Sequence, residues 1–379
     1  MKIVYINDLR IKGVYWRGIL ADLSKAAVLY GPKDIRIEDR TIPELCPDEV
    51  LIRSTDASIC ATEVKYWYKG IPQVPEGTHI VQGHELGGTI DELGSAVEKN
   101  HTVGSKVAVD PTLWCGACDM CMAGMSNLCR HIQFMSLPPV DGGFQQFYKV
   151  PAKNVHLVPS NMPLDWVSMA EPVSISLNAI SDAEQIVGTL SGKNIVIVGA
   201  GSLGLLLIQT LRLLREPHRI CILDLLDYRL KLAYEFGADA IINPKTDDSS
   251  DRIMDVTNGS EADLVFEVSG ESDAYQLSAN LVKPGGTVVI IGIPVEQEYI
   301  PIQCITTRRH GLTLKFVRRF NPKDFPKAIE MIASGKINVA KLITHTFSLD
   351  EITTAFKMLY AYSDGVIKAV IHPHSTFIQ

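Results

Sequence analysis

Residues 195–206 read IVIVGAGSLGLL, and this stretch decides the fold of the middle of the chain. It holds Gly199, Gly201 and Gly204 in the pattern G-x-G-x-x-G, between an apolar run that favours a strand and one that favours a helix. At such a turn, backbone N–H groups and the positive end of the helix can meet a pyrophosphate. The stretch predicts a dinucleotide site, and a close strand-to-helix turn without a ligand is the alternative.

The next predicted strand, residues 219–224, ends in Asp224, about 20 residues beyond Gly204. An acid at this place accepts hydrogen bonds from the ribose hydroxyls and repels a 2′-phosphate, which favours NAD over NADP. Arg229 follows at the start of a helix, where it either lies against an adenine face or is a solvated helix arginine. The residues predicted to bind the cofactor are Gly199, Gly201, Leu203, Gly204, Asp224 and Arg229.

Strands and helices alternate around this motif, which predicts βαβ units and a parallel sheet. The strand-like runs are residues 193–199, 219–224, 240–244, 263–268 and 287–292, and the helical runs are residues 205–214, 228–236 and 272–282. Gly237 and the pair Gly285–Gly286 follow helical runs, where a C-terminal glycine is expected. The middle of the chain is therefore predicted to be a doubly wound α/β unit.

The flanking segments have a different pattern. Residues 25–157 consist of short β-rich runs between Gly and Pro turns, which is typical of an all-β unit. After Arg319 the chain gives an amphipathic helix, an apolar segment, a second helix and a last strand. We expect this short tail to pack back onto the β-rich unit.

Length and composition exclude several classes of protein. The 379 residues are enough for two or three domains, and a net charge of −7 provides no positive field for nucleic acid. The hydrophobic content of 46% excludes a disordered or collagen-like chain. The uncharged residues 194–211 are interrupted by three glycines, so they indicate a buried strand and helix rather than a membrane span. Charges throughout the first 24 residues argue against a secretory signal, and we expect a cytoplasmic protein.

Four of the eight cysteines form a compact cluster in WCGACDMCMAGMSNLC, residues 114–129. The spacing C-x2-C-x2-C-x7-C lets four thiolates surround one tetrahedral Zn²⁺ with no position left for substrate, so the predicted site is structural. Disulfide pairing is disfavoured in a reducing compartment, and a nucleic-acid zinc module is disfavoured by the acidic balance. The predicted ligands are Cys115, Cys118, Cys121 and Cys129.

A second possible metal site is spread along the chain. Cys60 follows a predicted strand, His84 and Glu85 are adjacent in GHELGG, and Glu171 lies in AEPVS. One thiolate, one imidazole and carboxylates with a water position make the open type of zinc site used in catalysis. Taken singly, the cysteine fits a core position, the histidine a hydrogen-bonding role and Glu171 a helix cap, so the residues alone leave both interpretations open.

The motifs together resemble the zinc-containing medium-chain dehydrogenases, in the branch of sorbitol, xylitol and threonine dehydrogenases. The resemblance runs in order through SICATE, GHELGG, the four-cysteine cluster, GGFQQFYKVPAKNVHLVP, AEPVS, GAGSLG and ITHTFSLDEITTAF. It implies a GroES-like catalytic domain (residues 1–170), a Rossmann domain with a doubly wound parallel sheet (171–319) and a return to the catalytic domain (320–379), with a catalytic zinc in the cleft. Residues 1–23 lie outside it and either add a strand pair or form a poorly ordered extension.

The resemblance also implies roles for the residues of the second metal site. Cys60 and His84 are its firm zinc ligands, and Glu85 and Glu171 share the remaining positions with water. The acid in AEPVS is similar to that of polyol dehydrogenases, because simple alcohol dehydrogenases carry a cysteine there.

Three residues after Cys60 take their roles from the same resemblance. Thr62 matches the family's hydroxyl residue that forms a hydrogen bond with the zinc-bound alcohol. Glu63 stands where the family usually has Asp and supports His84 or the zinc. Lys65 replaces the proton-relay histidine of many members, which puts the outer relay in doubt.

These assignments predict an enzyme that oxidises a polyol, cyclitol or sugar hydroxyl with NAD. Tyr66, Trp67 and Tyr68, together with Arg318 and Arg319, are candidates to line its pocket. The closest rival substrate is threonine or another amino alcohol. A zinc-free NADPH quinone or enoyl reductase and a non-catalytic NAD-binding regulator are two further possibilities. The resemblance implies a homodimer or homotetramer formed through the strand at residues 287–292, and we expect no nucleic-acid or membrane partner.

Overall fold

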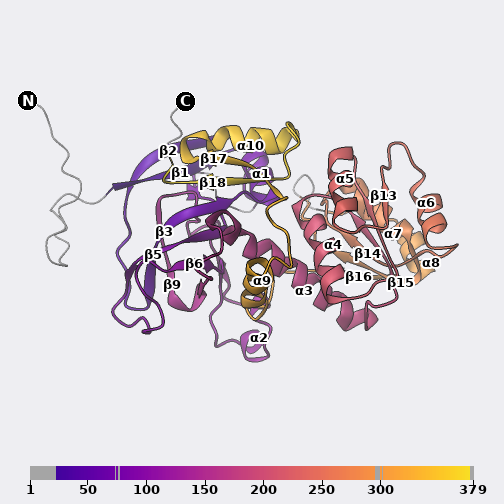
Figure 1. The fold of residues 1–379 in the computed structure, drawn as a ribbon, viewed down its shortest axis with the longest axis horizontal. Coiled ribbons are helices and arrows are strands. Elements are labelled where there is room, and N and C mark those ends of the chain that lie inside the picture. The colour runs from indigo at the N-terminus through magenta and orange to yellow at the C-terminus, as the bar shows by residue number, and fades with distance from the viewer. Residues whose placement is uncertain (1–22, 73, 76, 295–298, 301, 376–379) are drawn as a thin grey trace, which may run out of the picture.

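The computed structural model describes residues 23–375 except 73, 76, 295–298 and 301. A β-rich unit and a parallel α/β unit lie side by side, with helices α3 (Ala170–Val187) and α9 (Asp324–Ala333) between them (Figure 1). This arrangement confirms the predicted fold class. The extension proposed for residues 1–23 lies almost wholly outside the described residues.

The β-rich unit contains two main sheets. The smaller has the order β2-β1-β4, and the larger has the order β10-β6-β5-β3-β18-β17, with β9 also paired to β3. Their bounds are β1 (Leu23–Gly31), β2 (Asp34–Thr41), β3 (Glu49–Ser58), β4 (Ile80–Val81), β5 (Glu85–Leu93), β6 (Lys106–Val109), β9 (Phe147–Pro151), β10 (Val155–Leu157), β17 (Ile343–Ser348) and β18 (Lys368–His372). A further pair, β7 (Thr112–Leu113) and β8 (Gln133–Phe134), leads into and out of the four-cysteine segment.

The glycines of GHELGG let β5 approach β3 closely. A Cβ atom at Gly87 would lie 2.2 Å from the Asp56 carboxylate, and one at Gly88 would lie 2.4 Å from the Ile52 side chain. Both distances are too short for real atoms, so only glycine fits without displacing the partner strand. The close packing holds the start of β5, and with it His84 and Glu85, against the end of β3.

The α/β unit has six parallel strands in the order β13-β12-β11-β14-β15-β16. They are β11 (Asn194–Val198), β12 (Arg219–Leu223), β13 (Ala240–Ile242), β14 (Ala262–Glu267), β15 (Val282–Ile290) and β16 (Thr313–Phe316). The connecting helices are α4 (Ser202–Leu214), α5 (Asp227–Glu235), α6 (Ser249–Val256), α7 (Ser272–Leu281) and α8 (Cys304–His310). The strands of such a sheet are covered on both faces, which explains their continuous apolar runs.

Two local predictions for this unit had different outcomes. Gly237 follows α5 with a φ of +102°, as expected for a glycine that ends a helix. The same prediction for Gly285 and Gly286 was wrong, because α7 ends at Leu281 and the pair lies inside β15, where the register with β14 shifts.

The uncharged residues 194–211 divide into β11 and α4, as their glycines indicate. Across the part of the chain that the structure describes, no helix has both the length and the apolar character needed to cross a membrane.

The tail is divided between the two units. Helix α9 buries Phe325, Ala328 and Ile332 in the same core as α3 and α4. Strand β18 then pairs with β3 and with β17, while α10 (Ile352–Ala361) covers the β-rich core. Part of the segment after residue 319 therefore stays with the α/β unit, because the apolar face of α9 finds its partners there.

Candidate functional site

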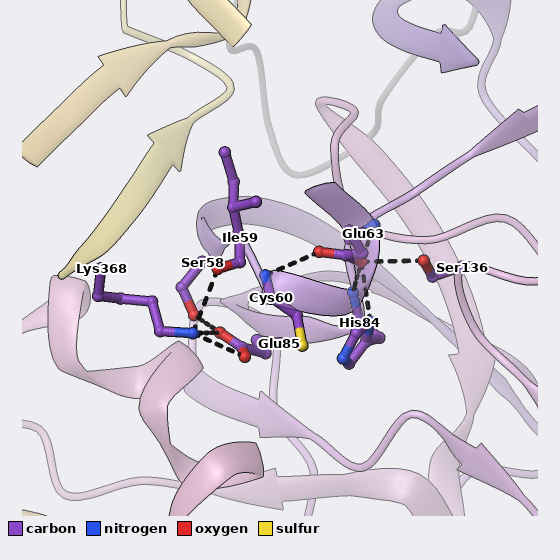
Figure 2. A network of polar contacts seen from close by, with 9 residues as sticks. Ser58, Ile59, Cys60, Glu63, His84, Glu85, Ser136 and Lys368 are labelled. Atoms are coloured by element: carbon purple, nitrogen blue, oxygen red, sulfur yellow. Dashed lines mark hydrogen bonds and ion pairs between the residues drawn. The ribbon is translucent and has the colours of Figure 1, made fainter. Parts of the chain in front are cut away.

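Cys60 lies at the junction between β3 and helix α1 (Ala61–Lys69), where it is the N-cap residue. Its backbone N–H donates to the Glu63 carboxylate at 3.0 Å, which completes a capping box at the start of the helix. The Cys60 sulfur and ligand atoms of His84 and Glu85 all lie within 4.8 Å of one another. In Figure 2 the sulfur lies between the side chains of His84 and Glu85.

Glu63 orients the His84 ring through a contact with Nδ1. Its Oε1 lies 2.8 Å from His84 Nδ1 and also accepts hydrogen bonds from the His84 backbone N–H and the Ser136 hydroxyl, at 3.0 and 2.9 Å. Because the carboxylate is an acceptor, Nδ1 carries the proton and Nε2 keeps its lone pair for a ligand. Burial raises the pKa of Glu63, but the hydrogen bonds that its carboxylate accepts, including the one from His84, lower it overall.

Glu85 belongs to a buried ion pair that was not predicted from the sequence. Both of its carboxylate oxygens lie 2.8 Å from Lys368 Nζ, and the Ser58 hydroxyl donates to one of them. The same ammonium group donates to the Ile59 carbonyl at 3.2 Å. Lys368 is 2% exposed, so its charge is balanced by Glu85 rather than by water (Figure 2).

Glu171 lies in the first turn of α3. It is buried, and within the described residues the cluster of mutually close ligand atoms does not extend to it. Burial raises its pKa to about 8; His84 and Lys368 oppose that rise and Glu85 adds to it.

Only part of the predicted pocket faces this site. Tyr66 is half-buried on α1; burial raises its pKa, Cys60 adds to that rise and His84 opposes it. The predictions for Trp67 and Tyr68 were wrong. Trp67 is buried against Phe356, and Tyr68 stacks on Tyr360 with ring centroids 3.9 Å apart. Consecutive helix residues point in different directions, so three in a row do not share one face.

Arg319 forms another wall of the site. Its guanidinium lies 4.2 Å from the Phe134 ring centroid, and that ring lies 5.2 Å from the His84 ring. Thr62 is half-buried in the first turn of α1. Lys65, on the same helix, reaches the α/β unit, where its ammonium donates to the Ile293 and Ser269 carbonyls at 3.2 and 3.4 Å.

The four clustered cysteines form a separate lobe, residues 115–129, around the short helix α2 (Asp119–Met122). Their sulfur atoms lie within 4.8 Å of one another, and Cys115 and Cys129 are 3.5 Å apart. All eight cysteines of the chain are free, so the structure contains none of the disulfides considered as an alternative. Backbone N–H groups of Cys121 and Arg130 lower the pKa of Cys118 to about 6, which favours the thiolate that binds metal.

The glycine motif forms the turn between β11 and α4. Gly199 has a φ of +109°, and a Cβ atom at Gly204 would lie 2.0 Å from the Gly199 carbonyl oxygen. A Cβ atom at Gly201 would meet no atom within 4 Å, so this side of the turn is open. An exposed cradle of backbone at a helix N-terminus fits a phosphate group. Leu203 is half-buried in the first turn of α4.

Asp224 follows β12 and contacts the glycine turn directly. Its carboxylate accepts from the backbone N–H of Ala200 at 2.7 Å and of Leu226 at 3.0 Å. Arg229 Nη1 lies 3.8 Å from the same carboxylate, and its guanidinium lies 4.8 Å from the Tyr362 ring centroid. The structure therefore brings together the residues predicted to meet the adenosine half of a dinucleotide.

Comparisons with known proteins agree with this geometry. Residues 46–160 match the alcohol dehydrogenase GroES-like domain, and residues 202–334 match the zinc-binding dehydrogenase domain. The sorbitol dehydrogenase of Bacillus subtilis (strain 168) is 31% identical over 355 residues, which cover 92% of this chain and 97% of that protein. The chain belongs to the zinc-containing alcohol and polyol dehydrogenases. D-xylulose reductase A of Aspergillus oryzae is 32% identical over 87% of this dehydrogenase and 91% of that protein.

Solved structures have the same fold as this dehydrogenase. An oxidoreductase/dehydrogenase of unknown specificity from Escherichia coli superposes with a TM-score of 0.84 at 29% identity, covering 93% of this chain and 99% of that one. A protein from Sinorhizobium meliloti 1021 that is assigned as a zinc-binding dehydrogenase and is bound to NADP superposes with a TM-score of 0.81. It is 28% identical, and the match covers 93% of this chain and 100% of that one. An alcohol dehydrogenase from Escherichia coli CFT073, in complex with NADH, superposes with a TM-score of 0.82 at 27% identity. The match covers 93% of this chain and 99% of that one. Zinc and a nicotinamide cofactor are thus properties of the family.

The side chains of this dehydrogenase fit such groups. Sulfur, imidazole nitrogen and carboxylate oxygen at the first cluster, and four sulfur atoms at the second, are the donors that zinc prefers. Sequence reasoning missed Lys368, although a lysine within the apolar run VIKAVI is a signal for a buried charge with a partner. It also missed Ser58 and Ser136, whose hydroxyls have no pattern that marks them.

Proposed function

We propose that this dehydrogenase oxidises a hydroxyl group of a polyol, cyclitol or sugar and transfers the hydride to NAD⁺, with one catalytic and one structural zinc. The observation that carries the proposal is the group Cys60, His84 and Glu85, in which Glu63 holds the His84 ring. A thiolate, an imidazole and carboxylates around an open position are typical of catalytic rather than structural zinc sites.

The proposed catalytic zinc is held by Cys60 and His84, with Glu85 and Glu171 as further oxygen donors. When bound there, it supplies a Lewis acid that lowers the pKa of a hydroxyl toward neutrality. Glu63 keeps the proton on His84 Nδ1 and so presents Nε2 to the site. The Thr62 hydroxyl would take the proton of the substrate hydroxyl while releasing its own proton to solvent water. The structural zinc is proposed for the four cysteines of the lobe.

The cofactor proposal depends on Asp224. Its carboxylate follows β12 beside the glycine turn, where it can accept from ribose hydroxyls and would lie against a 2′-phosphate. This negative charge supports NAD. The nearby guanidinium of Arg229 is the feature that favours NADP instead, and its ion pair with Asp224 reduces that attraction.

The substrate class is supported by the polar groups around the site. Tyr66, Glu171 and Arg319 offer a hydroxyl, a carboxyl and a guanidinium, which suit a molecule with several hydroxyl groups. The names of the relatives, a sorbitol dehydrogenase and a D-xylulose reductase, point in the same direction. Threonine or another amino alcohol is the second candidate, because Glu171 also suits an ammonium group.

Assembly and location are further parts of the proposal. We propose a homodimer or homotetramer that acts in the cytoplasm; the eight free cysteines support a reducing compartment. The predicted interface at residues 287–292 is wrong in detail, since β15 is paired on both sides. The edge strand beside β15 is β16, which carries the exposed Phe316, and β13 forms the opposite edge of the sheet.

The test is a screen for NAD⁺ reduction, read by NADH absorbance, across polyols, cyclitols, aldoses, threonine and simple alcohols. Zinc content is measured on the same sample, and NADP⁺ is run in parallel. Turnover of one polyhydroxy class with NAD⁺, lost on chelation, supports the proposal. Preference for threonine or for NADP⁺ overturns the corresponding part of it. A single zinc per chain with no turnover favours a non-catalytic protein, and zinc-independent reduction of a quinone or enone with NADPH favours the reductase.

A further inference from the structure

The segment that carries Arg319 has an unusual backbone. It lies between β16 and α9, and Arg319 has a φ of +52°, in the left-handed region that side chains other than glycine rarely adopt. Such a conformation costs energy and persists only where the surroundings hold it. Contacts on both sides of the segment provide this support.

The four-cysteine lobe supplies two of these contacts. Asn127 Nδ2, in the lobe, donates to the Arg318 carbonyl at 3.0 Å. Asn321 Nδ2 donates in the opposite direction, to the lobe carbonyl of Gly124, at 2.7 Å. On the inner side Phe320 is fully buried and stacks on Phe325 with ring centroids 5.5 Å apart. The backbone of Arg319 is thus fixed between the lobe and the core.

This position directs the Arg319 side chain into the active site. Its guanidinium lies over Phe134, which packs against the His84 ring. Within the described residues its Nη1 atom is buried and has no hydrogen-bond partner. Burial lowers the pKa of Arg319 to about 10, and Arg318 adds to that effect, while Glu171 and Asp110 oppose it. A buried donor without a partner, in a site for a small molecule, is suited to bind an oxygen atom of that molecule.

We propose that the four-cysteine lobe positions Arg319 for substrate binding, through Asn127 and Asn321. The lobe therefore sets the affinity of the active site in addition to stabilising the β-rich unit. Arg319 Nη1 binds a substrate oxygen, and the two asparagines act only through the geometry of residues 318–321. The part that concerns affinity rests on the function proposed above, whereas the positioning of the segment does not.

The first experiment measures positioning without any substrate. Amide hydrogen exchange is followed by mass spectrometry for peptides that contain residues 317–321, in the wild type, Asn127→Ala and Asn321→Ala. Loss of either hydrogen bond should raise the exchange rate of this segment about fivefold or more, which corresponds to the net contribution of one hydrogen bond. Asn280→Ala, the same change at an exposed helix position of the α/β unit, is the control and should leave this segment unchanged. Unchanged exchange in both lobe-contact variants overturns the proposal.

The second experiment measures KM and kcat for the polyol found in the screen, with zinc content determined for each variant. Asn127→Ala and Asn321→Ala should each raise KM about fivefold with kcat changed less than about twofold and zinc content unchanged. In an Arg319→Ala background the same changes should alter KM by less than about twofold, because their effect passes through Arg319. Additive effects on KM, or a fall in thermal stability with KM unchanged, overturn the proposal.

Failure of the proposed function gives a different result. If the wild-type protein turns over no polyol, the functional proposal fails, and the hydrogen-exchange comparison alone decides the positioning. Faster exchange in the two asparagine variants then supports the role of the lobe, and equal exchange overturns it.

Discussion

The two clusters of metal-ligand side chains differ in how much of the fold each one needs. The four cysteines come from residues 115–129 and lie in an exposed lobe, where backbone N–H groups of the lobe itself point at the sulfur atoms; the Ala117 N–H, for example, lies 3.5 Å from Cys115 Sγ. Cys60, His84 and Glu85 come from the ends of different elements and are largely buried. Their supporting groups include Ser136 and Lys368, which are distant in sequence.

The two clusters therefore depend on the rest of the chain to different extents. The lobe is a local structure whose geometry follows from spacing and from a few turns. The buried cluster is a product of tertiary structure, because β3, β5, α1 and β18 must all be in place before its charges are balanced. A substitution in the first should therefore act mainly on stability, and a substitution in the second mainly on catalysis.

The largest effect is expected for Cys60→Ser. Serine fits the N-cap position, so the fold should remain, but loss of the thiolate weakens the catalytic zinc site. We expect kcat/KM to fall about a thousandfold or more, since a Lewis acid contributes several kcal/mol to the reaction. Steady-state kinetics measure the loss of activity, and thermal melting tests whether the fold is kept. Cys46→Ser, at an exposed cysteine outside both clusters, is the control and should match the wild type.

Cys118→Ser, in the lobe, should lower stability more than activity, which is the opposite of the result expected for Cys60→Ser. Removing one of four ligands should release the structural metal and cost about 3 kcal/mol or more of unfolding free energy. Zinc content should fall from two atoms per chain to one, as measured by elemental analysis, and the melting temperature should drop while residual activity persists at low temperature. If Cys60→Ser and Cys118→Ser lose folding to the same extent, the division into catalytic and structural sites is wrong.

The smallest of the three effects is expected for Glu63→Gln. The amide keeps the size of the side chain but removes the charge that orients His84, so the affinity of the buried site for zinc should fall about 10- to 100-fold. Competition with a chromogenic chelator measures this change. Glu351→Gln is a close control, because Glu351 also completes a capping box, with Ser348, but belongs to neither cluster of metal-ligand side chains found in the described residues. Equal zinc affinity in wild type and Glu63→Gln contradicts the role given to this carboxylate.

The same contrast explains what the sequence could predict. The glycine motif and the four cysteines depend on neighbours in sequence, and the structure brings each set together as their spacing indicates. Cys60, His84 and Glu85 could be assigned to one site only from the family resemblance, because their separation in the sequence does not show that β3 and β5 are adjacent. Lys368 was missed because its partner arrives through the pairing of β18 with β3. Trp67 and Tyr68 were misplaced because the direction of each residue on α1 depends on where the helix packs.

The pairing of Lys368 with Glu85 also bears on the order in which the molecule matures during synthesis. The lobe has all its sulfur atoms outside the ribosome long before the α/β unit is made, so it can take up metal early. The carboxylate of Glu85 stays without its ammonium partner until β18 has emerged and paired with β3. We therefore expect the cysteine lobe to be complete well before the buried cluster, which needs Lys368 from near the end of the chain.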